Sequence, residues 1–314
     1  MRMMPDGAFF LTLVVASGGQ PNRLGRKNGL CSLRLSLCIT TYNNPAMLGR
    51  VLRGVARQTS LPEEVIICDD GSGPETRALV ARKAEGFPVP LRHAWEPDAG
   101  WRVSRTRNNG ILAAACPYLV FIDGDCVPHR RFIADHRRLA EPNCFIAGDR
   151  AHVHEAWVGR FDPTLPKVVY YLITKRLHKR RNALRVPWEK PLRFDRGSVD
   201  PDWMLQNVIG TNMAFWKEDA MRVNGFDETL EMWGPEDGEF LARLLNNGVK
   251  AKKHRRLAVT YHLDHPSSLN TGSPWYGLFH ERFRERAVWA GQGIDRHGGR
   301  ARLHPEETAG GSQP

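Results

Sequence analysis

Apolar residues gather in short runs, separated by longer stretches in which they recur every three or four positions. Each run is nearly continuous, as in a strand buried on both faces of a sheet. The runs are 35–39, 64–68, 90–94 and 118–122. Helical spacing lies between and after them, over 45–58, 74–83, 103–115 and 129–139. Because strands that alternate with helices are typical of right-handed βαβ units, the pattern predicts an α/β fold with a Rossmann-like, mostly parallel central sheet flanked by helices.

Two carboxylates follow the last of these runs directly, in Asp123-Gly124-Asp125. Open α/β sheets bind ligands at the carboxyl ends of their strands. Acids spaced one residue apart can approach a hard divalent cation and a sugar hydroxyl together. Asp and Gly also form tight turns, so the motif alone leaves a plain turn open.

Polar residues also follow the first two runs. Thr41, Tyr42 and Asn43 come after the first, and a Tyr and an Asn there can stack on and hydrogen-bond a nucleobase. Asp69 and Asp70 come after the second, where one acid can accept a hydrogen bond from uracil or ribose. An ordinary strand-to-helix turn and a helix cap explain the same residues without a ligand.

An acid pair and two histidines stand out in the C-terminal half. Glu236 and Asp237 are expected to open a helix, whose positive end stabilises carboxylates. His262 and His265 come after the apolar run 257–259, which is expected to be a strand. Helix-opening acids and structural histidines are the alternatives that involve no chemistry.

The chain of 314 residues has a formal net charge of +11, and much of the excess is local. Within 167–196, ten Lys and Arg residues stand against two acids, a net charge of +8. This balance favours a polyanionic partner, namely nucleic acid, an anionic membrane face or a phosphorylated substrate. The segment is predicted to form a basic amphipathic helix, which lies on an anionic leaflet or presents a solvated face. Its apolar face would consist of Val169, Leu172, Ile173 and Leu177.

The cysteines and the two ends of the chain bear on its location. Six cysteines show no paired spacing and several lie beside apolar runs, so buried reduced thiols and the cytoplasm are favoured. No apolar stretch reaches the ~20 residues of a membrane span. Residues 1–33 form a Gly- and Arg-rich leader and residues 292–314 a polar tail, and both are predicted to be disordered.

Taken in order, four motifs resemble the donor half of the inverting family 2 glycosyltransferases, which have the GT-A fold and use nucleotide sugars. They are CITTYNN, ICDDGS, RTRNNGILAA and YLVFIDGDC. The segment IGTNMAFWKEDAMRVNGFDETLEMWGPEDGEFLARLL is similar to the acceptor half of the galactosyltransferase and chondroitin-polymerase type. The resemblance covers 35–140 and 205–266, and it specifies fold and reaction type rather than the sugar.

The resemblance implies a uridine pocket lined by Thr41, Tyr42 and Asn43, with Asp69 or Asp70 on the base or ribose. It also places Arg107 and Asn108 near the nucleotide, although Thr106 stands where the family has Ala. A UDP-sugar is therefore the expected donor.

The resemblance implies a metal site and a catalytic base as well. Asp125 would bind Mn²⁺ or Mg²⁺, and Asp123 would contact the ribose or reach the metal through water. His262 would complete the metal site, with His265 as the second candidate. Asp237 would be the general base, and Glu236 a contact to the acceptor or donor sugar.

The resemblance divides the chain into four parts between its two ends. They are a nucleotide-sugar (donor) half at 34–140, a basic helical insertion at 141–204, an acceptor and catalytic half at 205–266 and a C-terminal helical segment at 267–291. The implied reaction is inverting transfer of a hexose or N-acetylhexosamine to a hydroxyl of a saccharide or lipid-linked glycan. The basic segment adds the expectation of a cytoplasmic enzyme on the inner face of the membrane.

Two rival functions predict features that the sequence lacks. A metal-dependent nucleotidyltransferase would have a Gly-rich phosphate loop after the first strand, where this chain has Thr41 to Pro45. A basic nucleic-acid-binding protein would show a recognisable module. No nucleic-acid partner is therefore expected.

Overall fold

The computed structural model describes residues 33–163, 165–178, 182–231, 234–265 and 273–304. The leader predicted for 1–33 lies, except for its last residue, outside the described residues. Within the described ranges, no helix combines the length and apolarity that a membrane crossing requires.

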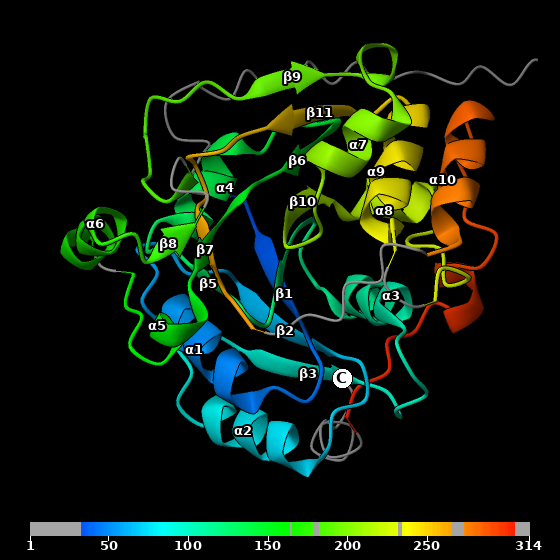
Figure 1. The fold of residues 1–314 in the computed structure, drawn as a ribbon. Coiled ribbons are helices and arrows are strands. Elements are labelled where there is room, and N and C mark those ends of the chain that lie inside the picture. The colour runs from blue at the N-terminus through cyan, green and yellow to red at the C-terminus, as the bar shows by residue number, and fades with distance from the viewer. Residues whose placement is uncertain (1–32, 164, 179–181, 232–233, 266–272, 305–314) are drawn as a thin grey trace, which may run out of the picture. The chain divides into compact units, whose positions relative to one another are not determined.

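Four parallel strands form the first half of an eight-stranded sheet, in the order β3-β2-β1-β4. They are β1 (Leu35–Thr41), β2 (Glu64–Asp69), β3 (Leu91–Trp95) and β4 (Tyr118–Asp123). Helices connect them in turn: α1 (Pro45–Ala56), α2 (Pro74–Ala84) and α3 (Val103–Ala113) (Figure 1). The chain proceeds outward from β1 in both directions, so the strand order switches between β1 and β4, where open sheets place ligands. The α/β fold and its mostly parallel sheet are thus confirmed.

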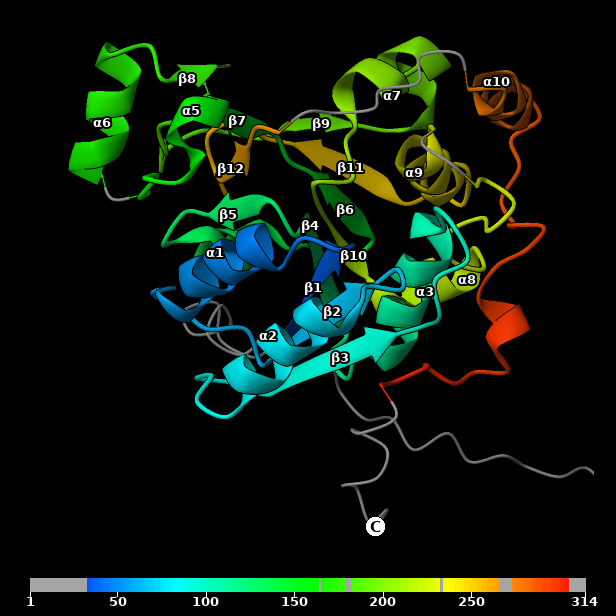
Figure 2. The same cartoon turned by 60° about the horizontal axis from the view of Figure 1, so that its bottom comes forward.

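Burial on both faces explains why these strands read as continuous apolar runs. All seven residues of β1 and all six of β2 are buried. Leu37 and Ile39 join one core cluster and Cys38 the other, because successive side chains point to opposite faces. Each fully buried Leu or Ile contributes roughly 1.5–3 kcal/mol. One cluster packs under α1 and α2 and the other under α3, and these helices lie on opposite sides of the sheet in Figure 2.

The sheet continues beyond β4 through antiparallel β10, and then β6, β11 and β9. These strands are β6 (Cys144–Ala147), β9 (Leu192–Phe194), β10 (Asn212–Trp216) and β11 (Lys250–Lys253). The helices of this half are α4 (Phe132–Leu139), α7 (Pro201–Asn207), α8 (Lys217–Arg222), α9 (Glu236–Asn246) and α10 (Trp275–Arg284). The acid pair therefore opens a helix, as expected.

A second sheet of four short strands has the order β5-β12-β7-β8. They are β5 (Cys126–Pro128), β7 (Arg150–Val153), β8 (Leu177–His178) and β12 (Thr260–Leu263). In β7, Ala151 and Val153 are buried while Arg150 and His152 are only half-buried. One face of this small sheet is therefore apolar and packed, and the other carries polar side chains.

The structure corrects the prediction of a helical insertion at 141–204. Short helices α5 (Glu155–Val158) and α6 (Leu165–Ile173) lie there, but so do four strands that join both sheets. The apolar face predicted for the basic helix also differs. Helix α6 ends at Ile173, and Val168 and Tyr171 are its buried residues instead.

Two further predictions are corrected. The strand expected at 257–259 begins instead at Thr260, because Ala258 lies in the left-handed backbone region with φ of 44°. His262 therefore lies within a strand. The tail predicted for 292–314 is ordered through residue 304, and it includes a short helix at Ile294–His297. His304 is buried and its ring stacks on His93, with centroids 5.5 Å apart.

Candidate active site

The candidate site begins where the strand order switches. Asp123 ends β4 beside Thr40 of β1, and the Thr40 hydroxyl donates to Asp123 Oδ1 over 2.8 Å. The next residue, Gly124, donates its backbone N–H to the Thr40 carbonyl over 2.7 Å. A Cβ at Gly124 would lie only 2.8 Å from that carbonyl oxygen, so no side chain fits. The turn is thereby fixed against β1 and leads Asp125 into β5.

Asp125 meets both candidate histidines. Its Oδ2 lies 3.4 Å from Nε2 of His262 and 3.0 Å from Nε2 of His265. One ligand atom from each of the three residues lies within 4.8 Å of the others. This closeness follows from the pairing of β12 with β5, which puts His262 opposite Cys126. One carboxylate and two imidazoles form a donor set that fits Mn²⁺ better than Mg²⁺, which prefers oxygen ligands.

Asp264 holds two imidazoles through one oxygen atom. Its Oδ1 accepts from Nδ1 of His262 over 3.0 Å and from Nδ1 of His152 over 2.7 Å. Because Nδ1 of His262 is engaged in this way, Nε2 is the atom that remains for a cation near Asp125. Sequence reasoning missed Asp264 and His152. The available signal was the spacing of Asp264 two residues after His262, because alternate residues of an extended segment point to the same side.

The two acids of the turn have different ionisation behaviour. Burial raises the pKa of Asp125, but hydrogen bonds with the two histidines outweigh it and hold the pKa below its usual value. Burial raises the pKa of Asp123, as does the charge of Asp125, whereas Arg107 and Arg150 lower it. Asp125 is therefore the more readily ionised carboxylate of the pair.

The acid pair of α9 also consists of two unlike carboxylates. Glu236 is buried, and its Oε1 accepts from Nη1 of Arg107 over 3.0 Å. Burial and the charge of Asp237 raise the pKa of Glu236 to about 7, although Arg107 opposes them. Asp237 is half-buried and accepts backbone N–H bonds from Gly210 and, over 2.8 Å, from Gly238.

Arg107 connects the acids of the two halves. Burial lowers its pKa, but the charges of Glu236, Asp123 and Asp237 raise it above the usual value. A Cβ at Gly210 would lie 2.5 Å from Nη2 of Arg107, so only glycine allows this approach. One buried guanidinium thus lies close to both the end of β4 and the start of α9.

The residues expected in the uridine pocket follow β1. Thr41 pairs in register with the last residue of β2. Tyr42 is 48% exposed, and its hydroxyl donates to Asp98 over 2.9 Å. Asn43 has a φ of 45°, and its Oδ1 accepts the N–H of Gly73 over 2.9 Å. The exposed Tyr42 ring is therefore the surface here on which a base can stack.

Asp69 and Asp70 are both buried and hydrogen-bonded. Asp69 Oδ2 lies 2.8 Å from Nε2 of His93. Asp70 accepts the backbone N–H of Arg102 over 2.8 Å and the Thr106 hydroxyl over 2.9 Å. Asp69 is 1% and Asp70 7% exposed, so Asp70 is the less enclosed of the two.

Asn108 has another role than the predicted nucleotide contact. It has no exposed surface, and its amide both donates to the Phe226 carbonyl over 2.9 Å and accepts the Phe226 N–H over 2.8 Å. A third bond joins it to Glu228 over 2.8 Å. Asn108 therefore ties α3 to the segment between α8 and α9 and supports Arg107, the preceding residue.

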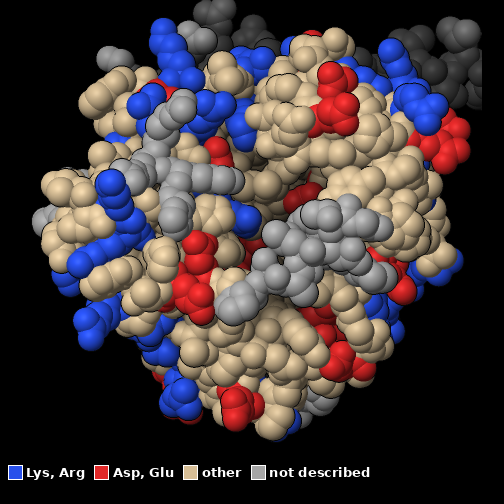
Figure 3. Space-filling model, in the orientation of Figure 1, with Lys and Arg blue, Asp and Glu red and all other residues tan. Residues whose placement is uncertain are grey.

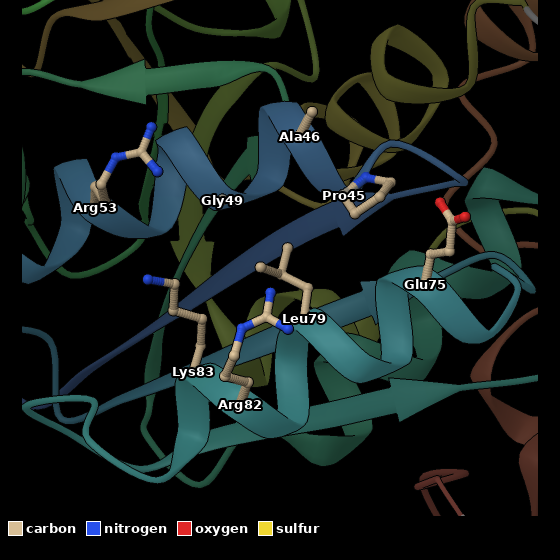
Figure 4. Close-up of a pocket in the computed structure, with 8 residues that line it drawn as sticks. All are labelled: Pro45, Ala46, Gly49, Arg53, Glu75, Leu79, Arg82 and Lys83. Carbon is tan, nitrogen blue, oxygen red and sulfur yellow. The ribbon is translucent and has the colours of Figure 1, made fainter.

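The surface is hollowed near β10 in the orientation of Figure 1, and acidic side chains are visible inside the hollow (Figure 3). Two other hollows, of about 470 and 310 Å³, flank α1. The larger lies between α1 and α2 and is lined by Arg53, Arg82 and Lys83 among others (Figure 4). No candidate site residue lines either of these two, so volume alone does not locate the chemistry.

Comparison with solved structures defines the fold. The chain superposes on residues 1–349 of S. aureus TarS in complex with UDP-GlcNAc, with a TM-score of 0.59, 15% identity and coverage of 84% of this chain and 69% of that one. It also matches GalNAc-T7 with UDP, GalNAc and Mn²⁺, with a TM-score of 0.55, 16% identity and coverage of 81% and 48%. The fold is therefore the GT-A glycosyltransferase fold.

The chain belongs to glycosyl transferase family 2, whose model matches residues 36–221. A second model, the N-terminal domain of galactosyltransferase, matches residues 195–266. The resemblance inferred from the motifs is thus confirmed, and the chain is a member of a glycosyltransferase family. Neither rival function is favoured.

Curated relatives extend the comparison. Validoxylamine A glucosyltransferase of Streptomyces hygroscopicus subsp. limoneus is 30% identical over 232 residues, covering 68% of this chain and 48% of that protein. Chondroitin synthase of Escherichia coli is 27% identical over 246 residues, covering 75% and 35%. Hyaluronan synthase of Pasteurella multocida is 27% identical over 275 residues, covering 79% and 26%. The matches thus span about half of these relatives' length or less.

Proposed function

We propose that the protein transfers a hexose or N-acetylhexosamine from a UDP-sugar to a hydroxyl of a saccharide or lipid-linked glycan, with inversion at the anomeric carbon. The observation that carries this proposal is the position of Arg107, whose charge acts on Asp123 of the donor half and on Glu236 and Asp237 of the acceptor half. Solved structures of the same fold contain UDP-GlcNAc, or UDP with Mn²⁺.

Asp125, His262 and His265 would hold a divalent cation, with Mn²⁺ suiting their donor atoms better than Mg²⁺. Such an ion supplies Lewis-acid neutralisation of the charge that develops on a departing diphosphate. Asp123, held by Thr40, would contact the ribose or a water of the ion. Because Asp125 ionises easily, the site would keep its negative ligand across the neutral pH range.

The proposed base is Asp237. Its two backbone hydrogen bonds, from Gly210 and Gly238, fix the carboxylate at the first turn of α9. There it would accept the proton of the acceptor hydroxyl as that oxygen attacks the anomeric carbon. Glu236 is buried against Arg107 and would contact a sugar hydroxyl rather than remove a proton.

The nucleotide would bind at the ends of β1 and β2. Tyr42 offers its exposed ring to the base, with Thr41 and Asn43 beside it. Asp70, which is less enclosed than Asp69, is the acid that we assign to the base or ribose. This assignment places the diphosphate between Tyr42 and the Asp123–Asp125 turn.

The function is tested with a panel of UDP-sugars and Mn²⁺, by measuring UDP release and the anomeric configuration of the product by NMR. Mn²⁺-dependent release from at least one of UDP-galactose, UDP-N-acetylgalactosamine, UDP-glucose or UDP-GlcNAc, with a β-linked product, is expected. A retained α configuration, or turnover that a chelator leaves unchanged, would refute the mechanism.

We also propose that the enzyme rests on an anionic membrane face, in the cytoplasm. Helix α6 exposes apolar side chains, with Val169 39%, Tyr170 49% and Ile173 75% exposed. Lys175 and Arg176 follow it directly, and such a combination suits an anionic leaflet. Co-sedimentation with phosphatidylserine vesicles at low salt is expected, and its failure there would remove this proposal.

A further inference from the structure

Arg150 lies on the polar face of the small sheet beside the candidate metal ligands. It starts β7, and His152 shares its face because side chains alternate along a strand. His152 pairs in register with His262 on β12. Arg150 and His262 therefore project to the same side of the sheet.

Strand pairing brings Arg150 close to the Asp123–Asp125 turn. Strand β12 lies between β5 and β7, and its His262 pairs with Cys126, the residue after Asp125, on one side and with His152 on the other. The guanidinium of Arg150 bonds to His152 and therefore lies beside the histidine that faces Asp125.

A chain of hydrogen bonds holds Arg150 by one side of its guanidinium. Its Nε donates to Nε2 of His152 over 3.3 Å, and Nδ1 of His152 donates to Asp264 over 2.7 Å. A guanidinium can only donate, so Nε2 of His152 is the accepting nitrogen and Nδ1 carries the proton that faces Asp264. The guanidinium is therefore oriented through Nε, and its two terminal NH₂ groups remain available.

No carboxylate among the described residues lies within ion-pair distance of Arg150. The other arginine near these acids, Arg107, is in contrast bound to Glu236. A half-buried, oriented guanidinium without an anionic partner, next to a cation site, matches the planar recognition of phosphate oxygens.

We propose that Arg150 binds the diphosphate of the nucleotide donor and stabilises it as the leaving group. The inference rests on the proposed function, since it assumes a nucleoside diphosphate at this site. As the bond between the anomeric carbon and the diphosphate oxygen breaks, its electron pair stays on that oxygen. The acceptor oxygen forms the new bond and gives its proton to Asp237. Arg150 remains protonated throughout and donates hydrogen bonds to the phosphate oxygens.

The test compares Arg150→Ala and Arg150→Lys with the wild-type chain and with Arg57→Ala, which removes an exposed arginine directly after α1. Calorimetry gives the affinity for UDP at saturating Mn²⁺, and electron paramagnetic resonance gives the affinity for Mn²⁺ alone. For Arg150→Ala we expect UDP affinity to fall about 10- to 100-fold, the range of a charged hydrogen bond. Arg150→Lys should lose less affinity for UDP, because lysine keeps the positive charge although it lacks the planar donors of the guanidinium.

The affinity for Mn²⁺ alone separates this role from a structural one. Removing a cation beside Asp123 and Asp125 should strengthen Mn²⁺ binding by on the order of a few-fold, whereas a collapsed site would weaken both ligands together. UDP affinity in Arg150→Ala equal to that of wild type, or a parallel loss of Mn²⁺ and UDP in both variants, would overturn the inference. Failure of the wild-type chain to bind UDP would instead refute the proposed function, and this inference with it.

Discussion

At the scale of single residues, the site contains adjacent acids whose surroundings make them different. Glu236 is buried with a pKa near 7, while Asp237 is half-buried at the surface of the same turn. Asp123 and Asp125 differ in the same manner, because two histidines stabilise only the second carboxylate. Different surroundings of this kind allow two neighbouring carboxylates to take separate chemical roles.

Replacing Asp237 with Asn should separate catalysis from binding. The amide oxygen can still accept one of the two backbone N–H bonds, that from Gly210 or that from Gly238, but the side chain can no longer take a proton. We expect kcat to fall about 10²- to 10⁴-fold, while the affinities for UDP and Mn²⁺, measured by calorimetry, stay within a factor of a few. Near-normal turnover in Asp237→Asn would exclude this residue as the base.

Replacing Asp264 with Ala should weaken metal binding without touching a proposed ligand. Both His262 and His152 would lose the oxygen that orients them. Partners of this kind affect metal affinity by roughly 10- to 100-fold, which a Mn²⁺ titration followed by electron paramagnetic resonance can measure. Asp202→Ala, at an exposed acid of α7, is the control. Equal affinities in the two variants would contradict the orienting role.

At the scale of helices and strands, the sequence predicted the elements whose burial is uniform. β1, β2 and β4 are buried over nearly their whole length and consist mostly of apolar residues, because both of their faces are covered, and α9 begins at its acid pair. The small sheet was missed because its strands have two to four residues and mix buried and polar positions. β11 was missed because two of its three lysines, Lys252 and Lys253, are buried, with Lys252 bonded to the Leu139 carbonyl over 2.7 Å.

The same reasoning explains which parts of the site were predictable. Asp125, His262 and the acid pair belong to motifs that lie in continuous sequence. Arg150 starts β7 and Asp264 directly follows β12. The pairing of these two strands brings together residues about a hundred positions apart in the sequence. Local periodicity carries no information on such pairing. Asn108 belongs to a motif, but only its burial revealed that it holds Phe226.

The ordered segment at 300–304 should depend on Asn109. This buried side chain donates to the Arg302 carbonyl over 2.8 Å and accepts the Arg302 N–H over 2.6 Å. Asn109→Ala removes both bonds at a cost of about 1–3 kcal/mol. Hydrogen exchange measured by mass spectrometry should then show faster exchange at 300–304. The exposed Asn247→Ala is the control, and unchanged exchange at this segment in Asn109→Ala would refute the link.

At the scale of the whole molecule, Glu236 makes stability depend on pH. Its pKa rises from 4.5 unfolded to about 7 folded, so the folded state favours the protonated acid. The contribution of protonated Glu236 to the free energy of unfolding is fully present below pH 4.5 and is lost as the pH rises through 7. Glu236→Gln stays neutral and should therefore become progressively more stable than wild type between pH 5 and 8.

Denaturant unfolding at several pH values measures this difference. The pKa shift of Glu236 sets an upper limit of about 3 kcal/mol on the stability that Glu236→Gln gains over wild type at pH 8. The weaker pairing of Arg107 with a neutral amide reduces this gain. Glu285→Gln, at an exposed glutamate of the turn after α10, should show no such trend. A constant difference between Glu236→Gln and wild type from pH 5 to 8 would show that Glu236 is ionised throughout.

The order in which the small sheet is assembled has a consequence for biosynthesis. β12 is the last strand of the chain to be made among the described residues, and it inserts between β5 and β7, which are made more than a hundred residues earlier. A nascent chain can contain Asp125 for much of its synthesis without either histidine partner. The proposed cation site should therefore form only after residue 265 has left the ribosome, so capture of the ion by a nascent chain would report that β12 has been inserted.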